Sequence, residues 1–300
     1  LYVTSYNFKQ YTTAYLYGIS NSSTQNTSVP YATGGDIIKT DGTYWYHGFL
    51  YSGTFTPLKS LSSVDYLVVA GGGASGSCKT DASAGGGAGG LRSTVSATGG
   101  GGSVETKLSL SAQAYTITVG AGGAATNWSF DGSNGNDSSI SGTGFTTITS
   151  VGGGGGGAGG TTSRTGGNGG SGGGGRGSTG GTGTSGQGYA GGNGSSSNYA
   201  SGGGAGSAGT VTGFNGANTG GSGVSNSISG TSVNYAGGGN AGGSQGNSYG
   251  GGNGDYPLDS NNRTAGTANT GGGGGGVWNS TSTLPGMAGG SGIIWIRYTV

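Results

Sequence analysis

The sequence predicts an all-β protein with almost no α-helix, in which an N-terminal β-hairpin region and a β-sandwich adjoin a packed bundle of polyglycine-II helices. Three observations predict this class. Glycine supplies 83 of the 300 residues, yet there are only 4 prolines and no strict Gly-X-Y register, which excludes collagen. The 17 tyrosines and 4 tryptophans argue against a solvated, disordered linker. Several segments also show the alternation of half-buried strands.

Residues 1–63 are predicted to form an N-terminal aromatic β region that includes an assembly arm. In "DIIKTDGTYWYHGFLYSGTFTP", Asp41-Gly42 lies between two strand-like runs, which is a strong hairpin signal. The upstream stretch "YVTSYNFKQYTTAYLYGIS" is rich in Tyr and Thr and is therefore expected to be extended. Such an arm pairs either with its own sheet or with the exposed edge of a neighbour, and both alternatives stay open.

Residues 64–300 are predicted to form a glycine-rich domain, in which residues 64–151 and 291–300 make a β-sandwich. "SVDYLVVAGGG" and "SGIIWIRYTV" are apolar on both strand faces, as buried strands are, and we expect them to pair in one sheet. "GFTTITSVG" adds a shorter strand. Alternating positions of "VETKLSLSAQAYTITVG" place five apolar side chains on one face: Leu108, Leu110, Tyr115, Ile117 and Val119.

Residues 152–290 are predicted to form the polyglycine-II bundle, with loops between its passes. Glycine is a poor former of helices and strands, but each glycine carries an N–H and a C=O that must be paired when buried. A polyglycine-II strand has three residues per turn and no internal hydrogen bonds, so these groups are free to bond laterally to neighbouring strands. "GGNGGSGGGG" places Asn168 and Ser171 three residues apart, on one edge of such a strand.

Motifs for nucleotide binding are present only formally. "YLVVAGGGASG" contains G-x-G-x-x-G at Gly71, Gly73 and Gly76, but no helix signal and no suitably placed acidic residue follow it, as a dinucleotide fold requires. A phosphate loop needs glycine before its Lys-Thr pair, and here Cys78 precedes Lys79. We therefore predict no bound cofactor.

Titratable residues are too few to predict a catalytic or metal site. The single histidine, His47, alternates with aromatic residues on a predicted strand and is expected at the surface or rim. The single cysteine, Cys78, is expected to be a free or buried thiol. The Asp- and Asn-rich stretches 130–139 and 251–262 suit tight turns, and their spacing does not match calcium-binding loops. No catalytic residue, no metal and no enzyme activity are predicted.

The order of motifs along the chain resembles the glycine-rich domain of bacteriophage tail fibres and adhesins. These motifs are "DGTYWYHGFLYSGTFTPLKSLSSVDYLVVAGGG", "AGGGAGGLRS", "YTITVGAGG" and the glycine runs that end in "GGSGIIWIRY", so the resemblance covers roughly residues 34–300. The resemblance implies a non-enzymatic, virion-associated protein, located on a tail or surface fibre or otherwise extracellular. It also implies stacked polyglycine-II helices that present loops to a receptor on the host surface.

Residues 186–280 mix Tyr, Asn, Ser and Gly, which is the composition of binding loops. Tyrosine there provides rigid contact area, and the small polar residues provide adaptable hydrogen bonds. The same aromatic residues are alternatively expected to cap the ends of the bundle and keep water from its backbone bonds. The candidates for receptor contact are Tyr189, Tyr199, Phe214, Tyr235, Tyr249, Tyr256 and Trp278.

The sequence thus predicts a fibre or adhesin protein that displays loops on a rigid glycine-rich scaffold for host-surface binding. The expected partners are a host cell-surface glycan or outer-membrane protein and other virion or fibre subunits, with the chain as a homo-oligomer. The alternative is a self-assembling filament subunit, extracellular or on a virion surface, that donates its N-terminal strand. A net charge of +1 and the lack of an apolar run of about 18 residues predict neither nucleic-acid binding nor membrane insertion.

Overall fold

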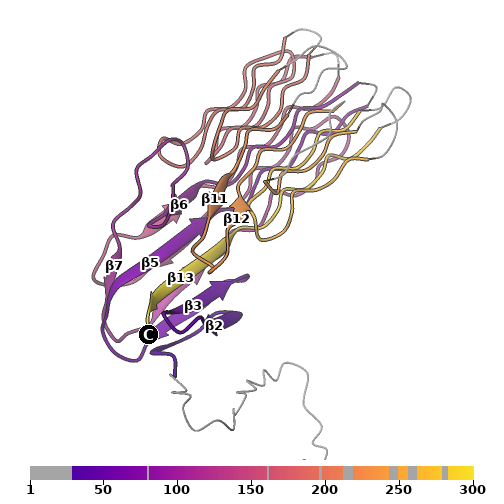
Figure 1. Ribbon diagram of the computed structural model, residues 1–300. Coiled ribbons are helices and arrows are strands. Elements are labelled where there is room, and N and C mark those ends of the chain that lie inside the picture. Colours follow the sequence, from indigo (N-terminus) through magenta and orange to yellow (C-terminus); the bar gives the residue numbers. More distant parts are fainter. Residues whose placement is uncertain are drawn as a thin grey trace, which may run out of the picture.

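A computed structural model describes residues 29–79, 81–160, 162–195, 198–211, 219–242, 249–255, 262–278 and 283–300. Within these residues the chain has no helix, so the predicted all-β class is confirmed. Figure 1 shows the large sheets gathered at one end of the molecule, with the glycine-rich segments extending from them as a bundle. The strands are β1 (Ala32–Thr33), β2 (Ile37–Thr40), β3 (Tyr44–Phe49), β4 (Gly53–Pro57), β5 (Leu61–Val69), β6 (Leu91–Ser93), β7 (Leu108–Leu110), β8 (Tyr115–Thr118), β9 (Ser138–Ser141), β10 (Ile148–Ser150), β11 (Val224–Asn226), β12 (Val233–Tyr235) and β13 (Ile293–Thr299).

The strands form two large antiparallel sheets and one small hairpin. One large sheet has the order β1-β4-β8-β9-β10, and the other has the order β2-β3-β13-β5-β6, with β7 also paired to β5. β11 and β12 form the hairpin. Both large sheets take strands from each side of residue 63, because β3 pairs with β13 and β4 pairs with β8.

The hairpin predicted around Asp41-Gly42 is confirmed between β2 and β3. Gly42 has a φ of +87°, the left-handed conformation that glycine adopts without steric cost. The Asp41 carboxylate closes the turn: it accepts hydrogen bonds from the N–H groups of Thr43 (2.9 Å) and Tyr44 (2.8 Å) and from the hydroxyl of Tyr46 (2.6 Å). The Tyr46 hydroxyl and these backbone N–H groups together lower the pKa of Asp41 to about 2.

The two doubly apolar strands lie side by side, as predicted: in β5 and β13, Tyr66 is opposite Ile296 and Val68 is opposite Ile294. Side chains from both large sheets meet in one apolar core, which makes the pair of sheets a sandwich. The alternation predicted for residues 108–119 is confirmed, because Leu108, Leu110, Tyr115 and Ile117 are buried in this core and Val119 packs at its edge. Other buried members are Phe49, Phe55, Val64, Ile140 and Tyr298.

The expectation that His47 lies at the surface or rim is wrong. Its side chain is fully buried, with its ring beside those of Phe55 and Tyr298. Nδ1 lies 2.6 Å from the carbonyl oxygen of Gly34, and Nε2 lies 3.1 Å from the hydroxyl of Tyr298. Since a carbonyl oxygen only accepts, Nδ1 carries the proton and Nε2 accepts from Tyr298. The prediction failed because His47 lies on the face of β3 that also carries Trp45 and Phe49, and this face packs in the core between the two sheets.

The glycine-rich segments bond to one another with a period of three residues, the pattern expected of polyglycine-II strands. The pattern also includes residues 71–78, which the sequence placed in the β-sandwich and not in the bundle. Along residues 71–78, N–H groups three positions apart donate to the same neighbouring segment, and consecutive N–H groups donate to different ones. Towards residues 130–136 the pairs are Gly71 to Asn136 (3.0 Å), Ala74 to Ser133 (2.9 Å) and Ser77 to Phe130 (3.1 Å). Towards residues 284–290 they are Gly72 to Gly290 (2.9 Å), Ser75 to Met287 (2.9 Å) and Cys78 to Leu284 (3.1 Å).

Close approach of neighbouring backbones explains why these segments consist of glycine. A Cβ atom built on Gly173 would lie 1.9 Å from the carbonyl oxygen of Gly155, and one built on Gly86 would lie 2.1 Å from that of Gly73. Residues 152–159 are all buried although they carry a single methyl side chain between them. The interior of the bundle is therefore main chain packed against main chain.

The prediction that residues 130–139 form a tight turn is wrong for most of this stretch. Residues 130–137 form a pass of the bundle, and their polar side chains point at a neighbouring pass with the same threefold period. Asp131, Asn134 and Asp137 each place Oδ1 2.8 Å from a backbone nitrogen of residues 152–158. These side chains act as acceptors at the rim of the bundle, because they bond to N–H groups that no other described backbone segment accepts.

Candidate functional site

Two pairs of glycine-rich passes begin and end on strands of the sheets, and their outer turns mark the far end of the molecule. After β5, the chain runs outward through residues 71–78 and returns through residues 83–90 to β6. Residues 120–126 and 130–137 make the same excursion between β8 and β9. In Figure 1 the outer turns of these passes lie at the end opposite the sandwich. The far end therefore collects side chains from turns that are distant in sequence.

One cluster at the far end is centred on Asp81. Arg176 donates to Oδ2 of this carboxylate, and the hydroxyl of Tyr199 donates to Oδ1. Arg176 also donates to the carbonyl oxygen of Thr162 (3.2 Å) and lies over the ring of Tyr199. Burial and the hydrogen bond to Asp81 raise the pKa of Tyr199 well above its usual range. Because Arg176 and Tyr199 are both buried, this cluster joins three turns together and offers little surface to a ligand.

A second cluster is centred on Asp255, whose side chain is fully buried. Arg263 Nη1 lies 3.1 Å from Oδ2 of Asp255, and the backbone N–H of Arg263 donates to Oδ1 (3.2 Å). Trp278 packs against Tyr199 and two buried alanines, and its backbone N–H lies 3.5 Å from Oδ2 of Asp255, which links the two clusters. These charges are paired inside the far end, so they hold its turns in place.

Two aromatic side chains at the far end are exposed instead of buried. Trp128 keeps 74% of its surface exposed and Phe130 keeps 62%. Both lie in the turn between residues 126 and 131, where Trp128 and Ser129 have φ values of 64° and 58°. A left-handed backbone is rare for a bulky residue such as tryptophan. Sequence reasoning missed both residues, although "NWSF" interrupting glycine-rich text is a signal that could have identified them.

The seven aromatic candidates for receptor contact do not lie together. Tyr199 and Trp278 share one cluster at the far end. Tyr235 is buried in β12 against the six-stranded sheet, and Tyr189 and Tyr249 are half-buried. The last two lie at the sheet end of the bundle, where Tyr189 bonds to Gly172 and Tyr249 bonds to Gly237. Phe214 and Tyr256 lie outside the described residues.

The thiol of Cys78 is free and buried, as expected. Burial raises its pKa to about 11, so it is protonated and unreactive near neutral pH. His47 lies in the sandwich, at the other end of the molecule, so it cannot act as a base for this thiol. Among the described residues, no group of three or more His, Cys, Asp or Glu side chains is placed to hold a metal ion.

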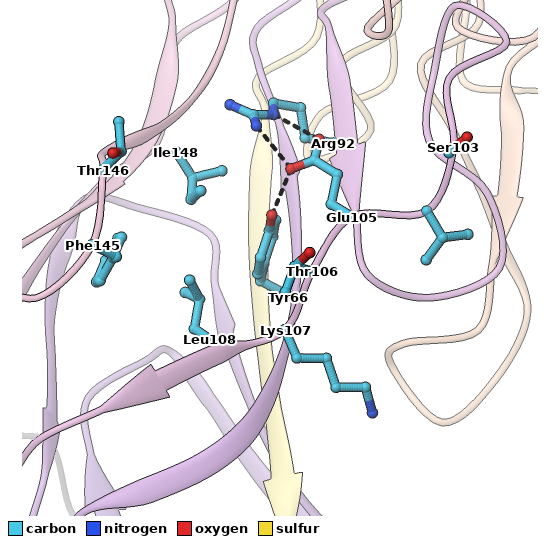
Figure 2. A pocket seen from close by; sticks show the side chains of 11 residues that line it. Tyr66, Arg92, Ser103, Glu105, Thr106, Lys107, Leu108, Phe145, Thr146 and Ile148 are labelled. Carbon is cyan, nitrogen blue, oxygen red and sulfur yellow. Dashed lines mark hydrogen bonds and ion pairs between the residues drawn. The ribbon is translucent and has the colours of Figure 1, made fainter.

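A shallow pocket of about 500 Å³ lies beside β5 and β6 on the sandwich (Figure 2). Glu105 lies at its centre and accepts hydrogen bonds from Tyr66 (2.5 Å) and from Arg92 (2.7 and 2.8 Å). Phe145 and Ile148 face these groups across the pocket. Burial and the bond to Glu105 raise the pKa of Tyr66. The polar side chains of Tyr66, Arg92 and Glu105 are hydrogen-bonded to one another, which is typical of a structural network.

The described residues include no apolar helix that could cross a membrane. The family model described as a glycine-rich domain matches residues 50–299. A comparison with curated proteins finds no match.

Proposed function

We propose that this chain, which belongs to the family of glycine-rich domains, is a non-enzymatic fibre or adhesin protein of a virion. In this proposal the sandwich faces the particle and the far end of the bundle binds a receptor on the surface of a bacterial host. The receptor is a surface glycan or an outer-membrane protein, and the chain acts as part of an oligomeric fibre.

The observation that carries this proposal is the construction of the far end. Lateral hydrogen bonds hold the described passes side by side. At their outer ends, the Arg176–Asp81 ion pair joins segments that are distant in sequence, and the Arg263–Asp255 ion pair bridges residues 255 and 263. A surface that is held rigid before binding loses little conformational entropy when it binds. Loops that are carried on a rigid scaffold are the usual place for recognition.

The placement of the two most reactive residue types supports a non-enzymatic role. His47 is a neutral core residue in the sandwich, and the Cys78 thiol is buried in the bundle. Nucleophilic catalysis needs a base within hydrogen-bond reach of the nucleophile. This pair does not meet that requirement.

The alternative function, a self-assembling filament subunit, is favoured by the open edges of the sheets. Among the described residues, β1 has one neighbour in the five-stranded sheet and β2 has one in the six-stranded sheet. An extended segment from another copy could add to such an edge by backbone hydrogen bonding. Residues 1–28 precede β1 and are the candidate donor.

Binding to cells tests the proposal and separates it from the alternative. A short peptide tag inserted after Gly160, in an outer turn, is expected to abolish binding of the labelled protein to a panel of Gram-negative cells in flow cytometry. The same tag inserted after Ser52, in the turn between β3 and β4, is the matched control and is expected to leave binding unchanged.

Removal of residues 1–28 gives the second comparison. If the chain is an adhesin, the shortened protein keeps its binding to cells. If it is a filament subunit, the shortened protein stays monomeric in light scattering where the full chain polymerises. If the full chain binds no cell in the panel and polymerises only when residues 1–28 are present, the adhesin proposal is wrong and the filament-subunit function replaces it.

A further inference from the structure

We infer that the turn of residues 126–131 is a saccharide-binding subsite, in which Trp128 and Phe130 contact the C–H face of a sugar ring and Asp131 and Arg164 bond to its hydroxyl groups. This inference rests on the proposed function, since it names the class of receptor that the far end recognises.

The first argument is that two large aromatic rings, those of Trp128 and Phe130, are exposed although the fold does not need them there. Trp128 and Phe130 are 74% and 62% exposed, although each ring has apolar area that folding usually buries. Neither ring takes part in an aromatic stack or a cation–π contact with the described residues. Their side chains therefore add little to the stability of the fold.

The second argument is that the backbone of this turn is strained and yet firmly held. Trp128 and Ser129 both have positive φ, and a strained backbone of this kind persists where the surrounding structure holds it and is common at functional sites. Ser77 holds the far side of the turn: its Oγ accepts from the N–H of Phe130 (2.9 Å) and donates to the carbonyl oxygen of Phe130 (3.1 Å). Thr126 Oγ1 donates to the same carbonyl oxygen (3.1 Å).

The third argument is the charged pair that adjoins the rings. Asp131 directly follows Phe130, and its Oδ2 lies 3.6 Å from Nη1 of Arg164. Both side chains are more than two-fifths exposed, unlike the buried pairs at Asp81 and Asp255. Oδ1 of Asp131 accepts from the N–H of Ala158 (2.8 Å), which fixes the carboxylate in position, while 44% of the side chain stays exposed.

These features together favour a saccharide over a protein as the ligand. A sugar ring presents an apolar C–H face and hydroxyl groups at its edge, which match an exposed ring beside a planar acceptor and a planar donor. A stable protein interface buries about 800 Å² per partner around an apolar centre. Here the exposed residues that flank the two rings are small or polar: Ala124, Ala125, Asn127 and Asp131.

Binding of the full-length protein to an array of bacterial lipopolysaccharides and capsular polysaccharides tests the inference. The wild-type protein is expected to bind at least one glycan, and Trp128→Ala is expected to weaken that binding by about tenfold or more. Asp131→Asn keeps an acceptor for Ala158 and removes the charge beside Arg164, so a smaller loss of about threefold is expected. Tyr51→Ala is the matched control, because Tyr51 is 73% exposed at the sandwich end.

Trp128→Gly separates recognition from folding. Glycine adopts the left-handed backbone of residue 128 without strain, so this variant is expected to keep or raise the melting temperature while losing glycan binding. The inference is overturned if the wild-type protein binds no glycan on the array, or if Trp128→Ala binds as the wild-type protein does.

Cell binding is measured in parallel, because it distinguishes failure of the saccharide inference from failure of the proposed adhesin function. Binding to cells that survives Trp128→Ala and disappears after the cells are treated with protease identifies a protein receptor. That outcome overturns the saccharide subsite and leaves the adhesin proposal standing. If the wild-type protein binds glycans on the array but binds no cells, the saccharide subsite stands and the adhesin proposal is overturned.

Discussion

The sandwich and the glycine bundle are both buried, but they are held together by different parts of the chain. In the sandwich, side chains such as Phe55 and Ile294 fill the space between two sheets, and the removal of their apolar surface from water stabilises the fold. In the bundle, residues 152–159 are buried with almost no side chains, and their N–H groups donate to other passes or to rim side chains. Loss of volume should therefore damage the first region, and gain of volume should damage the second.

The largest effect is expected from adding a methyl group to the bundle. In Gly173→Ala, the new Cβ would lie 1.9 Å from the carbonyl oxygen of Gly155. The backbone cannot move away because Gly173 bonds on other sides to Gly167 and Gly181, each at 2.9 Å. We expect a loss of more than about 4 kcal/mol in the free energy of unfolding, or no soluble protein.

Gly53→Ala is the matched control for this change. Gly53 is exposed, and the nearest atom to a Cβ there is 3.8 Å away on the side chain of Phe49. The control is expected to melt within a few degrees of the wild-type protein, followed by circular dichroism. A Gly173→Ala protein that melts like the control would show that the passes are not packed backbone to backbone.

The sandwich is expected to show the opposite sensitivity, with a somewhat smaller effect. Ile294→Ala removes buried apolar atoms and leaves a cavity in the core, which should lower the free energy of unfolding by about 3–4 kcal/mol. Leu58→Ala, at a residue that is 62% exposed, should change it by less than about 0.5 kcal/mol. Urea denaturation of both variants measures the difference, and equal midpoints would contradict a side-chain core between these sheets.

The far end should be the part of the bundle that depends on side chains. Arg176→Met leaves Asp81 and Tyr199 without their cation, and because the Asp81 side chain is 23% exposed we expect a loss of about 2–3 kcal/mol. Arg164→Met breaks an ion pair that is about two-fifths exposed, so it should cost less than about 1 kcal/mol. Thermal melts of the two variants make the comparison. Equal destabilisation would mean that the Asp81 cluster does not join the turns.

The smallest effect is a pH dependence confined to the sandwich. Burial lowers the pKa of His47 in the folded protein below its unfolded value of 6.5. The unfolded state therefore binds more protons between these two pKa values, so stability is complete above about pH 6.5 and falls as the pH drops below it. In His47→Gln this part of the pH dependence should disappear, as measured by the melting temperature between pH 5 and 8. An unchanged slope would assign the dependence to other groups.

Much of the sandwich could be predicted from the sequence because strand periodicity and turn chemistry are local signals. Asp41-Gly42 marked the hairpin, and the alternation through Leu108 and Ile117 marked one buried face. The burial of His47 could not be predicted, because its ring faces the core between the two sheets and its nitrogens lie beside Gly34 and Tyr298, of which Tyr298 is 251 positions away in the sequence. The same alternating pattern fits a strand with one face exposed and a strand with both faces covered.

The candidate site could be predicted less well than the fold. The composition of residues 186–280 indicated binding loops, but the structure separates its aromatic residues between the two ends of the bundle and places Tyr235 in a core. Trp128 and Phe130 lie outside that stretch and were missed. Their exposure depends on which passes lie beside the turn, and no local pattern encodes that.

By itself, the sequence determined that this chain would form strands at its two apolar segments and threefold glycine strands between them, since both follow from the conformations that the residues allow. Only the tertiary structure decided which pass lies beside which, and therefore which N–H groups at the rim need Asp131, Asn134 and Asp137 as acceptors. The physical reason is that backbone groups are identical in every glycine run. Lateral bonding between such runs carries no sequence code, so partners are selected by the sheets that anchor the runs and by the side chains at their ends.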